Sequence, residues 1–123
     1  LYSVATDGAL SQRSPRLESI LPAVRYMENN LQSAVSVDAL AALCFMSKST
    51  FHRRFQAEFH ISPTAWHLDA RIQKSRELLL SGLYSVEQVA EIMGFCDTCY
   101  FSRMFYKRTG QHAGALRPRR ERP

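Results

Sequence analysis

The stretch VDALAALCFMSKSTFHRRF at residues 37–55 recurs, with one extra residue, as VEQVAEIMGFCDTCYFSRMF at residues 86–105. Both copies place small or branched apolar residues at matching positions, and both close with Phe-x-Arg-x-Phe, at residues 51–55 and 101–105. In each copy the apolar spacing predicts a short helix, a turn of about three or four residues and a second helix. That is the size and order of a helix-turn-helix unit, so the repeat predicts two such units in one chain.

The rest of the chain also has helical spacing, and no stretch alternates as a half-buried strand would. Ser14-Pro15 is typical of a cap followed by a first-turn proline. Between the two copies, Ser62-Pro63 and Gly82 bound a longer helix. Further caps are predicted at Ser36 and at Ser85, which forms a capping box with Gln88.

These patterns predict an all-α protein of about seven helices, in which a long linker helix joins two helix-turn-helix subdomains. The expected organisation is a linker or ragged end at 1–13, a first unit at 14–60, the linker helix at 61–82, a second unit at 83–117 and a basic tail at 118–123. The predicted buried positions are Leu17, Ile20, Val24, Met27, Leu31, Val37, Leu40, Leu43, Cys44, Phe51, Phe55, Phe59, Leu68, Ile72, Leu79, Val86, Val89, Ile92, Met93, Phe101 and Phe105.

The chain has 123 residues, a formal net charge of +5 and three cysteines. No apolar run approaches the roughly 18 residues of a membrane span, and no signal peptide opens the chain. We therefore expect a cytoplasmic protein in a reducing setting, without a membrane partner. Since the first residue is Leu1 rather than Met, we expect the sequence to begin inside a longer protein. The basic balance suggests a polyanionic partner, although charge alone fits a solvated basic surface equally well.

An arginine recurs at the centre of each Phe-x-Arg-x-Phe motif. With ~100° per residue and the phenylalanines toward the core, Arg53 and Arg103 point outward from the second helix of each unit. In a helix-turn-helix this face enters the major groove, where an arginine can donate two hydrogen bonds to guanine. We predict that both arginines read bases, the alternative for each being a solvated surface arginine. Ser49 and Cys99 lie near them on the outer face, and His52 and Ser102 lie at its edge. The predicted phosphate-binding residues are Ser47, Lys48, Arg54 and Lys107.

At these residues the chain resembles the DNA-binding domain of the AraC/XylS family of bacterial transcription regulators, over about 16–117. The motifs that carry the resemblance are VAEIMGF at 89–95, YFSRMFYKRTG at 100–110 and the first Phe-x-Arg-x-Phe. The resemblance implies binding to double-stranded DNA and regulation of transcription, most often activation. It also implies RNA polymerase as a partner, a separate effector-binding or dimerisation domain on the N-terminal side, and a place at the bacterial nucleoid. The base-reading positions it implies are Ser49, His52 and Arg53 in the first unit and Thr98, Cys99, Ser102 and Arg103 in the second.

Two positions depart from the family's pattern. His60 lies where the family usually has glycine after the first reading helix, so we expect a strained or differently shaped helix end. His112-Ala113 replaces the usual threonine or serine followed by proline after the last glycine, which weakens the prediction of a final short helix.

Cys96 and Cys99 form a C-x-x-C, which leaves a thiol or zinc sensor as the alternative function. A structural zinc site usually needs four ligands, and the chain has no second C-x-x-C. Cys44 falls on a predicted buried face, where a cysteine packs as a small apolar residue. Cys96 lies near a helix N-terminus, which can lower the pKa of a thiol, so a redox-sensing role for it is the remaining alternative. A third possibility is a helical module whose basic surface binds an acidic protein. The histidines show no ligand spacing, and no nucleophile motif, phosphate loop or carboxylate pair appears, so we expect neither an enzyme nor a cofactor or metal.

Overall fold

The computed structural model describes residues 14–118, and all regular structure in that range is helical. The helices are α2 (Pro15–Glu28), α3 (Val37–Leu43), α4 (Lys48–Phe59), α5 (Pro63–Ser81), α6 (Val86–Ile92), α7 (Thr98–Thr109) and α8 (Ala113–Leu116). The predicted all-α class is confirmed. The predicted ragged end at 1–13 and the tail arginines after residue 118 lie outside the described residues. Across the described range, no helix is both long enough and apolar enough to cross a membrane.

Helices α2 to α7 each begin at a side chain that accepts a hydrogen bond from the backbone N–H three residues further on. Such a cap satisfies one of the backbone donors that every helix start leaves unpaired. The capping residues are Ser14, Ser36, Ser47, Ser62, Ser85 and Asp97. The capping box of Ser85 with Gln88 is present, and α5 ends at Gly82, as predicted. The cap at Asp97 was not predicted.

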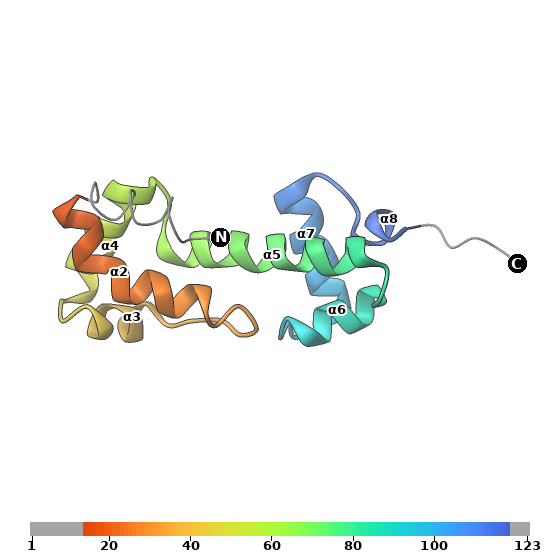
Figure 1. Cartoon of the computed structure of the whole chain (residues 1–123), viewed down its shortest axis with the longest axis horizontal. Helices are drawn as coiled ribbons and strands as arrows, with labels where there is room; N and C mark the ends of the chain where they lie inside the picture. Colours follow the sequence, from red (N-terminus) through yellow and green to blue (C-terminus); the bar gives the residue numbers. More distant parts are fainter. Residues whose placement is uncertain (1–13, 119–123) are drawn as a thin grey trace, which may run out of the picture.

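Two separate apolar cores lie toward opposite ends of α5 (Figure 1). The first is built from α2, α3 and α4, and Trp66 of α5 packs against it. The second is built from α6, α7 and the remainder of α5, with Ala113 of α8. Each core contains two completely buried phenylalanines, Phe51 and Phe55 in the first and Phe101 and Phe105 in the second. The fold is thus two helix-turn-helix subdomains joined by one long helix.

Two predicted core positions are wrong in detail. Leu43 is 40% exposed, because the buried face of α3 runs through Leu40, Ala41 and Cys44, and at ~100° per residue Leu43 is turned away from it. Leu31 does not extend the apolar stripe of the first helix, since α2 ends at Glu28, and it packs instead against the second core.

Both departures from the family's pattern have visible structural consequences. His60 ends α4 with φ of 67°, in the left-handed region that disfavours residues with a Cβ, so the expected strain is confirmed. The last short helix, α8, does form after His112, but the His112 side chain makes no capping hydrogen bond. Ala113 instead anchors α8 by burial in the second core.

Candidate nucleic-acid interface

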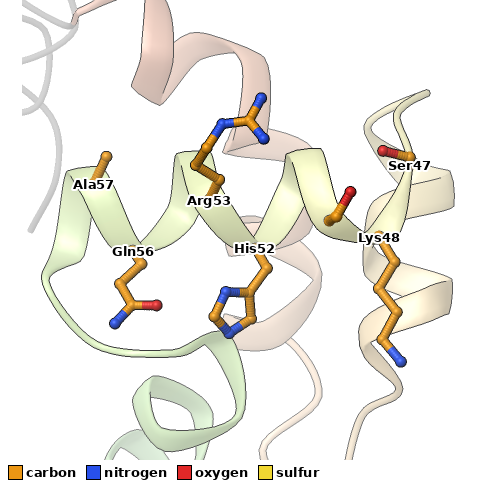
Figure 2. Close-up of a pocket in the computed structure, with 7 residues that line it drawn as sticks. Ser47, Lys48, His52, Arg53, Gln56 and Ala57 are labelled. Carbon is orange, nitrogen blue, oxygen red and sulfur yellow. The ribbon is translucent and has the colours of Figure 1, made fainter.

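The outer face of α4 carries two parallel rows of side chains, spaced four residues apart as neighbours on a helix surface are. Figure 2 shows Lys48, His52 and Gln56 projecting to one side of the helix, and Arg53 and Ala57 to the other. These residues, with Ser47 and Ser49, are exposed and line one open pocket on the protein surface.

The core contacts of α4 fix which way this face points. Phe51 and Phe55 are completely buried, and their ring centroids lie 5.8 Å apart. Because Arg53 falls between them in sequence, two residues from each, helical geometry turns it about 160° away from each ring. The outward direction predicted for Arg53 is therefore confirmed, and Ser49 and His52 share its exposed surface.

Helix α7 repeats this arrangement fifty residues later. Phe101 and Phe105 are completely buried with ring centroids 5.7 Å apart, and Arg103 between them is exposed. One row holds Thr98, Ser102 and Tyr106, and the other holds Cys99, Arg103 and Lys107. Thr98 and Ser102 are half-buried, so the exposed part of this face consists of Cys99, Arg103 and Lys107, together with Tyr106.

The residues predicted to bind phosphate do not share one surface. Lys48 belongs to the outer face of α4, but Arg54 lies on the next row of the helix, together with Glu58. The Glu58 carboxylate accepts a hydrogen bond from Ser14 Oγ at 3.2 Å and pairs with Arg16 at 3.8 Å, so this row lies beside the start of α2 at Glu58, whereas Arg54 is exposed.

Ser47 and Lys107 occupy opposite ends of their helices. Ser47 Oγ caps α4 by accepting from the Thr50 N–H at 3.2 Å and donates to Thr50 Oγ1 at 2.9 Å. Its hydroxyl is thus committed to the helix start. Lys107 is exposed in the last turn of α7, one helical turn beyond Arg103.

The C-x-x-C is explained by the local fold. The turn before α4 and the turn before α7 align up to Phe95, and Cys96 is the extra residue of the second turn, placed just ahead of the Asp97 cap. Cys96 and Cys99 are exposed free thiols, and no group of three or more His, Cys, Asp or Glu side chains suited to a metal occurs in residues 14–118. Cys44 is buried, and this burial raises the pKa of its thiol. Nothing in the described structure supports a thiol or zinc sensor.

Sequence reasoning missed the polar residues that α5 buries, His67, Arg71 and Ser75. Burial is the main cause that lowers the pKa of the His67 imidazole and of the Arg71 guanidinium. The available signal was their spacing of four residues, which puts the three on one stripe of the linker helix. His67 and Arg71 on that stripe bond to backbone carbonyls of residues 30–31, which follow α2, and Arg71 also bonds to the carbonyl of Met93 after α6.

The helix-turn-helix domain family matches residues 40–119, which covers both second helices and the linker helix. With two exposed, arginine-bearing second helices, the chain is a helix-turn-helix DNA-binding domain of a transcription regulator. Similar solved structures indicate to which family of regulators the domain belongs. The structure is similar to an AraC-type DNA-binding regulator from Chromobacterium violaceum, with a TM-score of 0.76, 25% identity and coverage of 89% of this chain and 93% of that one.

It is also similar to the DNA-binding domain of AdpA, solved in complex with a target DNA, with a TM-score of 0.71, 29% identity and coverage of 84% of this chain and 89% of that one. Together these matches show that the chain belongs to the AraC/XylS family, as a DNA-binding domain.

Two curated relatives extend the comparison. The chain is 33% identical to the HTH-type transcriptional regulator GbdR of Pseudomonas aeruginosa over 113 residues. The aligned region covers 92% of this chain and 29% of GbdR. It is 34% identical over 121 residues to the transcriptional activator NphR of Rhodococcus, which covers 95% of this chain and 36% of that protein. The chain therefore spans about a third of the length of these relatives.

Proposed function

We propose that this domain binds double-stranded DNA sequence-specifically, with α4 and α7 in successive major-groove segments, and thereby regulates transcription. The observation that carries the proposal is the repeated outward arginine, Arg53 and Arg103, opposite a buried phenylalanine pair in each subdomain. Arginine is the side chain best suited to guanine, and the net charge of +5 favours the phosphate backbone.

The linker helix has a suitable length for this arrangement. With 19 residues, α5 is about 28 Å long. Major-groove segments on one face of B-DNA recur about every 34 Å, so a linker helix of this length has the size needed to hold two subdomains about one turn of DNA apart.

Within each subdomain we assign side chains to two roles. Base contacts come from the outer rows, where Arg53 and Arg103 are the principal readers. The other proposed base-reading residues are Ser49, His52, Thr98, Cys99 and Ser102. Phosphate contacts are proposed for Lys48, Lys107 and Arg54, and for the backbone N–H groups at Ser47, since its hydroxyl already caps α4.

The larger context is also a proposal. Because relatives named as transcriptional regulators and activators are about three times as long, we propose that a separate effector-binding or dimerisation domain belongs to the intact protein. We propose activation through RNA polymerase at the bacterial nucleoid in the cytoplasm, and a binding role rather than a catalytic one.

Selection of bound sequences from a random duplex pool tests the proposal directly. Enrichment of a defined bipartite site is expected, with affinity for it falling steeply as salt is raised. Equal recovery of all sequences would contradict sequence-specific reading. Tight binding to an acidic protein, with no DNA retained at moderate salt, would favour the interaction module instead.

Single substitutions then separate the two roles. Arg53→Ala and Arg103→Ala should each cost about 1–3 kcal/mol on the selected site and relax selectivity at one or two base pairs. Lys107→Ala should weaken selected and random duplexes about equally and reduce the salt slope by about one. If Arg103→Ala left the ratio of selected to random affinity unchanged, α7 would not read bases through that residue.

A further inference from the structure

The segment that follows α2 packs against the turn between α6 and α7, so the two subdomains touch each other beside the linker helix. Leu31 packs on the second core. Gly94, in the turn, has φ of 73°, and a Cβ built on it would come within 1.9 Å of the Gln32 carbonyl oxygen. The backbones of the first and second subdomains therefore approach each other as closely as a glycine allows.

Two side chains of α5, those of His67 and Arg71, stabilise this contact by hydrogen bonds to its backbone. The His67 imidazole donates from Nε2 to the Asn30 carbonyl at 2.8 Å. One turn on, Arg71 donates from Nε to the Leu31 carbonyl at 3.0 Å and from Nη2 to the Met93 carbonyl at 2.6 Å. Its Cζ also lies 4.3 Å from the centroid of the Phe95 ring. A single arginine on the linker thus bonds to the backbone of both subdomains.

The chemistry of Arg71 makes this contact specific. Arg71 is only 7% exposed, and none of the ion pairs in the described part of the chain uses it. Its charge is instead balanced by carbonyl oxygens beyond the ends of α2 and α6, which lack helical partners. The planar fork reaches two of them at once, whereas a lysine ammonium is a single point charge on a flexible stem.

We propose that this contact, centred on Arg71 and Gly94, is a spacing device that fixes α4 and α7 relative to each other. This inference rests on the proposed function for its consequence, which is that the domain tolerates only one separation between the two half-sites in DNA. Arg71 is a positioning residue in this scheme. It reaches no outer-face side chain of α4 or α7, and it acts through the backbone segments it joins.

Spin labels test the device without DNA. Nitroxides on Cys99 and on an introduced Ala57→Cys, in a Cys96→Ser background, report the distance between α7 and α4 by double electron–electron resonance. Both positions are exposed, and Cys44 is buried. A single narrow distance distribution is expected for the starting protein, and a broadened or shifted one for Gly94→Ala and for Arg71→Lys.

Gly110→Ala is the matched control for Gly94→Ala. Gly110 has nearly the same backbone, φ of 75°, but a Cβ there meets nothing within 4 Å. Both alanines therefore suffer the left-handed strain, and only Gly94→Ala forces the subdomains apart. An unchanged distribution in folded Gly94→Ala, or equal broadening in Gly110→Ala, would overturn the proposal. Circular dichroism checks folding, and if Arg71→Lys unfolds, Gly94→Ala decides the question.

A second measurement uses the 123-residue chain with its selected duplex and with duplexes in which one base pair is inserted or removed between the halves. The native chain should prefer the selected spacing, and Gly94→Ala should lose that preference while single halves bind as before. If Gly94→Ala kept the preference for the selected half-site spacing although its spin-label distances were broadened, the contact would not set the spacing of half-sites in DNA. Failure to bind any duplex would refute the proposed function, whereas the label distances would still report on the device.

Discussion

The C-terminal ends of α4 and α7 offer an internal comparison of backbone strain. His60 ends α4 with φ of 67°, and Gly110 ends α7 with φ of 75°. Each donates its backbone N–H four residues back, to Gln56 and Tyr106 respectively, at the same distance of 2.8 Å. At the cap position itself the difference is that His60 carries a Cβ where Gly110 has none.

Exchange of these residues should therefore change stability in opposite directions. A left-handed conformation costs an L-residue about 1–2 kcal/mol, while glycine loses about 0.4–1 kcal/mol through the greater entropy of its unfolded chain. His60 is exposed, so its side chain contributes little burial to offset the strain. His60→Gly should raise the free energy of unfolding by about 0.5–1 kcal/mol, and Gly110→Ala should lower it by a similar amount.

Thermal and urea denaturation followed by circular dichroism measure the difference. For a chain of this size, His60→Gly should raise Tm by about 2–4 °C. His60→Ala is the control, because it removes the imidazole but keeps the Cβ, and its Tm should stay near that of the starting protein. If His60→Ala stabilised as much as His60→Gly, the imidazole rather than the backbone would be at fault. A lower Tm for His60→Gly would refute the strain argument outright.

Three further predictions concern other parts of the molecule. Cys96→Ser should leave Tm and DNA affinity unchanged under reducing conditions, whereas stoichiometric zinc or unfolding by a chelator would contradict this reading. Phe101→Ala should cost about 3–5 kcal/mol in urea denaturation, because the ring is fully buried, while Tyr106→Ala on the exposed face should cost far less. Burial lowers the pKa of His67 in the folded state, so the unfolded state takes up its proton first. The free energy of unfolding should thus fall as pH drops below about 6.5, and His67→Gln should flatten that slope.

The helices and the direction of the outer faces of α4 and α7 could be predicted from sequence because both depend on short-range rules. A cap such as Ser85 acts within three residues, and Phe-x-Arg-x-Phe fixes three directions within one turn and a half. The outward position of Arg53 and Arg103 followed from this spacing. Their contact with bases stays a prediction, since it depends on a partner that the chain does not contain.

The contact between the subdomains could not be predicted in the same way. Arg71 bonds to carbonyls 40 residues before it and 22 residues after it. Every residue has a backbone carbonyl, so the sequence does not indicate which carbonyls a side chain will bond. Leu31 was misplaced for the same reason. Its apolar character continued the stripe of the first helix, but the helix stops at Glu28 and the residue serves the second core.

The turns of the two helix-turn-helix units show how such a long-range contact limits which residue a position can hold. Phe45 and Gly94 are equivalent, since each has a left-handed backbone and donates its N–H to the carbonyl three residues earlier, at 3.1 and 3.0 Å. Turn geometry alone would favour glycine at both. Phe45 is 96% exposed, so its Cβ costs backbone strain and nothing more. At Gly94 the same Cβ would also collide with the Gln32 carbonyl, which no rotamer change can relieve. The difference between the copies therefore follows from the docking contact, because the Cβ position of Gly94 lies against the Gln32 carbonyl, whereas Phe45 in the first turn is exposed.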